Sequence, residues 1–210
     1  MEITSIKSKH ILKIIDSDEK TDIYGSNQDW YPRKRQQISG CGPATVTNIL
    51  YYIQRTHFQK DTNPVLTKDK CIELMNEMWN YVTPGMRGIP STAILGKGVN
   101  KYLQEHGLDI SLDYLDIPKK KQLRPDLRTV VEFLSKAFEA DTPVAFLNLD
   151  KGKAEGLESY HWVTAISLEY SLDDNLAYLN IFDCGEEIKI DLLCWLETTK
   201  SGGGFVRFVL

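Results

Sequence analysis

Residues 36–50 read QQISGCGPATVTNIL, and this stretch decides how the rest of the chain is interpreted. From Cys41 onward, apolar residues recur three and four positions apart, at Val46, Ile49, Leu50 and Ile53. This spacing is typical of a helix that buries one face. Pro43 stands in the first turn, where its missing N–H costs nothing. The stretch therefore predicts a helix that begins at Cys41.

More helices, and then a series of strands, are expected after this first helix. Apolar residues at helical spacing predict helices over residues 68–82, 91–106 and 126–140. Apolar runs bounded by turn residues predict strands over residues 144–149, 161–168, 176–183, 187–190 and 205–210. Because helices come first and strands later, we expect an α+β fold in which an antiparallel sheet packs against the helical half.

Length and composition favour a single domain. The chain has 210 residues, of which 42% are apolar, so it can bury a substantial core. We expect residues 1–35 to form an N-terminal arm with a short strand and a loop. Residues 36–142 are expected to be mainly helical and residues 143–210 mainly β.

Charge and cysteine content exclude some classes of protein. The net charge of −4 gives no general attraction to phosphate backbones, and the one basic cluster, at 119–121 with Arg124, is expected to be a solvated loop. We therefore expect no nucleic acid partner. The charged first thirty residues contain no signal-peptide pattern, and we expect no membrane span. Four cysteines without a CxxC pair favour the cytoplasm, although a trimmed secreted chain would look the same.

Cys41 is a candidate nucleophile. The dipole of a helix N-terminus and a neighbouring imidazolium stabilise a thiolate, which is the form that attacks carbonyl carbon. Gly40 and Gly42 would let a substrate backbone approach, and the Cys41 N–H is free to donate to an oxyanion. A small buried cysteine that begins a core helix is the alternative at this point.

His161 is the histidine that best fits as the partner of this cysteine. His10 lies in a polar arm, and His57 and His106 lie at the ends of expected helices, where the dipole favours an imidazolium. His161 instead opens the apolar strand HWVTAISL. It could still be a structural histidine of the core.

Asp183 is expected to lie beside His161. The strand LAYLNIFD ends at Asp183, and Asp173-Asp174-Asn175 before it is a turn sequence. A turn centred on residue 172 or 173 pairs His161 with residue 183 or 185 in an antiparallel hairpin. Either register leaves Asp183 on the face of His161, where it can orient the imidazole. A cap of the following turn is the alternative role for Asp183.

The blocks QQISGCGPATVTNIL, HWVTAISL and NIFDCG together resemble the bacteriocin leader-processing cysteine peptidases and their stand-alone relatives in the papain-like superfamily. The resemblance implies a papain-like fold and a catalytic triad of Cys41, His161 and Asp183. It also implies a glutamine amide in the oxyanion hole, usually six residues before the cysteine. Arg35 occupies that position here, so Gln36 is our candidate and Gln37 the alternative.

We therefore expect a cysteine peptidase or amidase that acts on a peptide or protein and needs no cofactor or metal. An acyltransferase with the same triad and a catalytically silent binding protein are the alternatives. Loops at 83–92 and 150–160 flank the expected site and are candidates for substrate recognition. Cys184, next to Asp183, is expected to be a small residue without a role. The sequence does not predict an oligomeric state.

Overall fold

The computed structural model describes residues 1–16, 23–59 and 65–210. At its centre is a seven-stranded antiparallel sheet in the order β5-β10-β6-β7-β8-β9, with β1 beside the second half of β7. Its strands are β1 (Glu2–Ser5), β5 (Ser111–Ile117), β6 (Val144–Asn148), β7 (His161–Ser171), β8 (Leu176–Asp183), β9 (Glu186–Asp191) and β10 (Gly203–Val209). A smaller sheet contains β2 (Lys13–Ile15), β3 (Ile23–Tyr24) and β4 (Leu66–Thr67).

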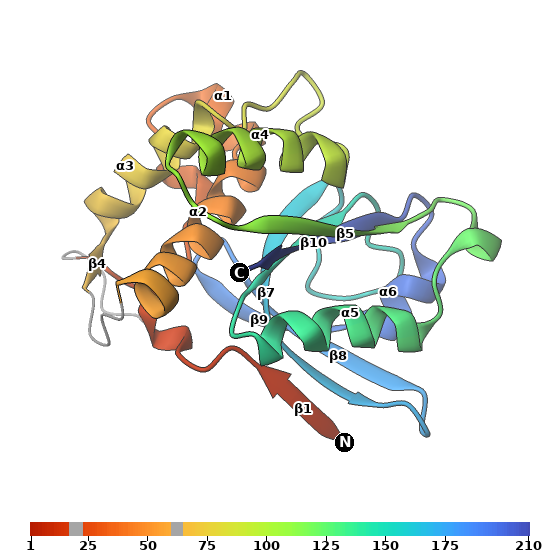
Figure 1. The fold of residues 1–210 in the computed structure, drawn as a ribbon. Coiled ribbons are helices and arrows are strands. Elements are labelled where there is room, and N and C mark those ends of the chain that lie inside the picture. Colours follow the sequence, from red (N-terminus) through yellow and green to blue (C-terminus); the bar gives the residue numbers. More distant parts are fainter. Residues whose placement is uncertain (17–22, 60–64) are drawn as a thin grey trace.

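Most of the α-helices lie in the first two thirds of the chain, and the last one lies near its C-terminal end. They are α1 (Lys34–Ser39), α2 (Cys41–Ile53), α3 (Lys68–Trp79), α4 (Thr92–Glu105), α5 (Leu127–Glu139) and α6 (Leu192–Thr198). A π-helical turn, η3 (Gln54–Phe58), extends α2, and short 3-10 turns occur at η1 (Lys9–Leu12), η2 (Gln28–Trp30) and η4 (Lys121–Leu123). In Figure 1, α1 to α4 lie together at one end of the sheet.

The core has two parts, one on each face of the sheet, because successive residues of a strand point to opposite faces. One cluster joins strand residues such as Leu147 and Trp162 to the apolar sides of α2 and α4. The other joins alternate residues such as Phe146 and Val163 to α5 and α6. The helical half thus packs on an antiparallel sheet, which confirms the predicted α+β fold.

Three elements differ from the sequence-based expectation. The mainly helical region contains β5, an edge strand whose half-exposed side chains give no clear alternation and whose partner is the distant β10. The seven-residue α6 is too short to show a helical period, although Asp191 caps it by accepting from the Cys194 N–H. The expected N-terminal arm contains β1, β2 and β3 where one short strand was expected, and α1 begins at its end, at Lys34.

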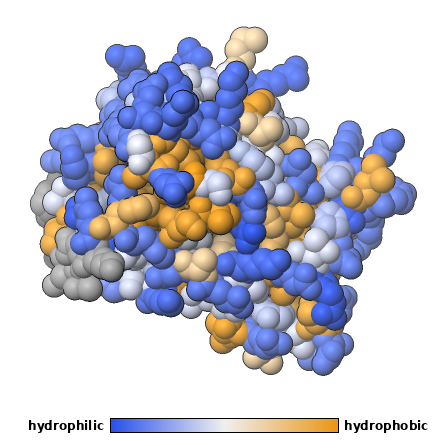
Figure 2. All heavy atoms as spheres, in the orientation of Figure 1, coloured by the Kyte–Doolittle hydropathy of each residue, from blue (hydrophilic) through white to orange (hydrophobic). Residues whose placement is uncertain are grey.

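The helices do not cover the sheet completely. Figure 2 shows apolar residues at the surface in the middle of one face, around the C-terminus between α4 and α5, with hydrophilic residues on all sides of them. Among the described residues, no helix combines the length and the apolar character needed to cross a bilayer.

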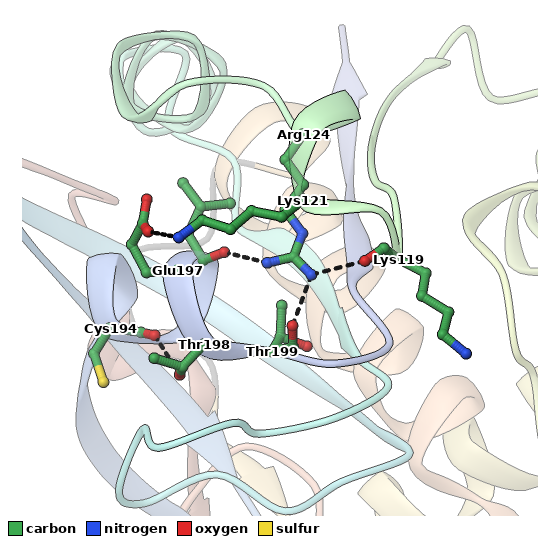
Figure 3. A network of polar contacts seen from close by, with 8 residues as sticks. Lys119, Lys121, Arg124, Cys194, Glu197, Thr198 and Thr199 are labelled. Atoms are coloured by element: carbon green, nitrogen blue, oxygen red, sulfur yellow. Dashed lines mark hydrogen bonds and ion pairs between the residues drawn. The ribbon is translucent and has the colours of Figure 1, made fainter.

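The basic cluster at 119–124 is tied to α6. The Arg124 guanidinium donates to the backbone oxygens of Leu196 and Thr199, at 2.7 and 2.6 Å, and Lys121 pairs with Glu197 (Figure 3). Arg124 also donates to the carbonyls of residues 118 and 119. Its donors are therefore used within the protein, and the expectation of a purely solvated loop is wrong for Arg124.

Candidate active site

Cys41 is the first residue of α2, and the two glycines beside it have packing roles. A Cβ on Gly40 would lie 2.4 Å from a ring carbon of Tyr31, and a Cβ on Gly42 would lie 2.7 Å from the Ile89 side chain. The glycines therefore let protein segments approach the start of α2. The Cys41 N–H lies in the first turn, where helix N–H groups have no acceptor within the helix.

His161 and Asp183 form a buried pair. The Nε2 of His161 lies 2.7 Å from Asp183 Oδ1, and the two side chains are 8% and 11% exposed. Cys41 and Cys184 line the same small pocket as His161. Burial alone lowers the pKa of His161, but its interactions, with Asp183 foremost and with Cys184 and Cys41 after it, raise that pKa well above its ordinary value. Because Nε2 faces Asp183, Nδ1 is the nitrogen left for a thiol.

A β-bulge brings this pair together. Near the turn, Ser171 pairs with Leu176, and continuing that register would place Asp183 on the face opposite to His161. The register shifts by one residue between Ala165 and Ser167, so Thr164 pairs with Phe182 and His161 falls opposite position 185. The turn spans residues 172–175, slightly beyond the predicted centre. Asp183 lies on the same face as His161, as predicted, because the one-residue shift at the bulge offsets the shifted position of the turn.

Asn48 connects α2 to the strand that carries His161. Its Nδ2 donates to Thr164 Oγ1 of β7 at 3.0 Å, and its Oδ1 accepts from both the backbone N–H and the hydroxyl of Ser26. Asn48 and Thr164 are both buried. These contacts fix the helix of Cys41 relative to the strand of His161. Sequence reasoning missed Asn48, although a polar residue inside the apolar pattern TVTNIL was a usable signal.

Neither predicted glutamine lies in the pocket that contains Cys41 and His161. Gln36 is buried, and its Nε2 donates to Asn76 Oδ1 of α3 at 3.1 Å. Gln37 donates to the backbone oxygens of Asp29 and Tyr31, at 3.1 and 2.9 Å, and so fastens α1 to η2. The expected position of the Gln36 amide beside Cys41 is therefore corrected, because α1 turns that side chain toward α3.

A different glutamine, Gln28, lines a small pocket together with Cys41, His161 and Asp183. Its Oε1 is buried and has no hydrogen-bond partner among the described residues. The turn that carries it, η2, is held by Gln37 on one side and on the other by Asn27, whose Nδ2 donates to the Cys184 carbonyl at 3.1 Å. Sequence reasoning missed Gln28, which lies thirteen residues before Cys41 and shows no local signal.

Cys41 also borders a larger pocket of about 490 Å³. Its walls come from α1, the 86–90 segment, β6 and the start of β7, and they are mainly apolar. The Trp162 Nε1–H donates to the Ile89 carbonyl at 2.8 Å and anchors the 86–90 segment to β7. Tyr160, at the end of the second predicted recognition loop, lines the same pocket and is exposed. Both loops singled out in the sequence thus contribute to this cavity.

Cys184 lies close to the His161–Asp183 pair. One ligand atom from each of these three residues lies within 4.8 Å of the others, which is the single such group of potential metal ligands found in the described part of the chain. A thiophilic ion could use this set, but it would compete with the 2.7 Å contact that orients His161. Burial raises the pKa of the Cys184 thiol and favours its neutral form.

Comparison with known proteins found a structural relative. No family model matches the chain, and no curated protein does. Among solved structures, UfSP from C. elegans, a papain-like cysteine protease, matches with a TM-score of 0.54 and 12% sequence identity. The match covers 100% of this chain but 34% of UfSP. The narrower resemblance to bacteriocin leader-processing peptidases stays a prediction. The chain has the papain-like α+β fold.

Proposed function

We propose that this protein is a cysteine peptidase or amidase that cleaves a peptide or amide bond in a peptide or protein. The observation that carries the proposal is the buried 2.7 Å contact between His161 and Asp183, in a small pocket that Cys41 also lines. A nucleophile, a base and an orienting carboxylate in this order are the elements of a thiol-dependent acyl transfer.

In the proposed reaction, the proton of the Cys41 thiol resides on His161, whose protonated form Asp183 stabilises, and the thiolate attacks the substrate carbonyl. His161 then gives this proton to the leaving amine, which leaves an acyl group on the sulfur as a thioester. Water hydrolyses the thioester, with His161 again acting as the base. Asp183 keeps Nε2 of His161 engaged and so presents Nδ1 to the thiol.

We assign the oxyanion hole to the Cys41 backbone N–H and the Gln28 side-chain amide. Gln28 shares a pocket with Cys41 and its amide has an unpartnered buried atom, whereas the Gln36 amide is bonded to Asn76. Rotation of the Gln28 amide about its last bond exchanges N and O, which are of similar size, so its NH₂ group can face the pocket. Gln28 thus replaces Gln36 in this role.

Labelling with substoichiometric iodoacetamide near neutral pH, read by mass spectrometry, tests the proposal. We expect Cys41 to react first and the His161→Ala variant to slow its reaction by at least tenfold. Cys71, which is fully buried, and the half-buried Cys194 serve as internal controls. Labelling of Cys71, Cys184 or Cys194 ahead of Cys41, or an unchanged Cys41 rate in His161→Ala, would contradict a catalytic thiol and favour a silent binding protein.

The acyl acceptor is read in a second step of the same experiment. The protein is incubated with a peptide mixture and a primary amine, and products are identified by mass spectrometry. A peptidase gives hydrolysed product that disappears in Cys41→Ala, whereas predominant amine coupling would identify the protein as an acyltransferase.

A further inference from the structure

A second cavity lies along α1, beside the Cys41 pocket. It has a volume of about 510 Å³ and is lined by Pro32, Arg33, Arg35, Gln36, Asn76, Trp79, Asn80 and Thr83. We call it the α1–α3 pocket. Both pockets share α1, since Ile38 and Ser39 line the Cys41 pocket and Arg35 and Gln36 line this one. A chain bound at Cys41 could therefore continue into the α1–α3 pocket.

Gln36, which lines the α1–α3 pocket, has an unused hydrogen-bond acceptor. Gln36 is only 7% exposed, and its Nε2 is bonded to Asn76 Oδ1, which fixes the orientation of the amide. Its Oε1 is buried without a partner among the described residues. An unpaired buried acceptor is unfavourable, so a ligand that supplies an N–H donor would remove this cost.

The rim of the pocket is positively charged. Arg33 and Arg35 are exposed, and neither forms an ion pair within the described ranges. The lining includes no aspartate or glutamate, although the chain as a whole has a net charge of −4. This local excess of guanidinium groups favours carboxylates, which arginine binds in a bidentate manner.

The Gln36 acceptor and the two arginines together favour one kind of ligand, which carries both N–H donors and negative charge. An inorganic anion would satisfy the arginines but has no N–H for Gln36, whereas an acidic peptide has both carboxylates and backbone N–H groups. We propose that the α1–α3 pocket binds an acidic segment of the polypeptide substrate, with carboxylates on Arg33 and Arg35 and a backbone N–H on Gln36. The proposal rests on the proposed peptidase function. Since α1 has six residues, the acidic residues would lie roughly three to six positions from the cleaved bond.

Peptide binding to the full-length Cys41→Ala protein tests the proposal without catalysis. A fluorescent glutamate-rich octapeptide and its glutamine counterpart are compared by anisotropy at low ionic strength. We expect the glutamate peptide to bind, the R33Q/R35Q double change to weaken it by about fivefold or more, and added salt to weaken it further. The matched control is K119Q/K120Q, which removes two cations from an exposed loop elsewhere and should leave binding unchanged.

Several results would overturn the proposal. These are equal binding of the glutamine peptide, unchanged binding in R33Q/R35Q, an equal loss in K119Q/K120Q, or displacement of the glutamate peptide by oligo(U) at lower concentration than by unlabelled peptide. In the active protein, R33Q/R35Q should raise KM for a substrate with an acidic extension and leave kcat, and cleavage of an unextended substrate, unchanged. Binding by Cys41→Ala together with an inactive wild type would instead contradict the peptidase function alone.

Discussion

The imidazole of His161 is buried, yet Asp183 stabilises its protonated form. Its pKa in the folded protein lies above the value of about 6.5 expected in the unfolded chain. Between these two values, the folded state binds more protons than the unfolded state. The contribution of His161 to stability is therefore complete below about pH 6.5 and is lost as the pH rises toward the raised pKa.

We accordingly predict that the free energy of unfolding of the wild type falls between pH 6.5 and 9, and that Asp183→Asn makes this fall shallower. Urea unfolding at pH 6, 7.5 and 9 measures the effect. His10→Gln is the matched control, because His10 is exposed and far from the site in sequence. Parallel pH profiles for the wild type and Asp183→Asn would show that the raised pKa does not depend on Asp183.

The role of Gln28 can be measured independently of the residues that activate the Cys41 thiol. An oxyanion forms during attack on a carbonyl but not during alkylation by iodoacetamide. We predict that Gln28→Ala lowers kcat by about 10²–10³-fold, the usual effect of losing one oxyanion donor, while Cys41 alkylation keeps its rate. Steady-state kinetics on an unextended peptide, beside timed alkylation, provide the measurement.

Gln36→Ala is the control for this change, since it removes the same kind of amide from the α1–α3 pocket instead of the pocket of Cys41 and His161. It should alter kcat on the unextended peptide by less than about threefold, because Gln36 does not touch the reacting atoms. If Gln36→Ala reduced kcat more than Gln28→Ala, the sequence-based assignment would be the correct one.

Residue chemistry allowed the three central groups to be named from the sequence. Cys41 stands at a helix start, His161 opens an apolar strand, and Asp183 ends the next one, and each has a local signal. Gln28 and Gln36 have no such signal. Their positions depend on where α1 and η2 pack, which is fixed by contacts such as that of Gln37 with the Tyr31 carbonyl.

Between elements, Asn48 is the main polar connection of α2 to β7 near the site. Asn48→Ala would leave Thr164 and Ser26 with unpaired buried groups. We predict a loss of about 2–4 kcal/mol in the free energy of unfolding, measured in urea. Thr164→Val keeps the shape of the side chain and removes one of these hydrogen bonds, so it should cost about 1 kcal/mol. Equal losses in both variants would mean that the Ser26 contacts contribute nothing.

Elements with a long periodic pattern were predicted within a few residues. The expected helices at 68–82, 91–106 and 126–140 correspond to α3, α4 and α5, and the expected strands correspond to β6 to β10. The missed elements are short or depend on distant partners. α6 spans two turns, and β5 exists because β10 pairs with it along its whole length.

For the whole molecule, sequence order and spatial layers agree only in part. The predicted helical half does pack on the β half, but β1 and β5 come from the first 117 residues and join the same sheet as the C-terminal strands. The sheet thus connects segments that were expected to be an arm, a helical part and a β part. Such long-range pairing has no signature in local sequence.

The similarity to UfSP concerns this layout rather than individual residues. At 12% identity the two chains share an arrangement over all 210 residues here, because hydrophobic pattern and topology constrain a fold more than side-chain identity does. UfSP is about three times as long as the matched part, so its remaining segments have no counterpart in the match.

Because of the bulge between Ala165 and Ser167, His161 and Asp183 share a face of the sheet only if β7 keeps its present number of residues between His161 and the turn. Deleting one residue from the first half of β7 would place His161 on the face opposite to Asp183, whereas changes within the 172–175 turn that preserve the Ser171–Leu176 pair would not. The Ile6 N–H donates to the carbonyl of the extra residue, Ile166, at 3.0 Å. Anyone who grafts this hairpin onto another scaffold must therefore transfer the bulge together with the N-terminal segment that contains Ile6.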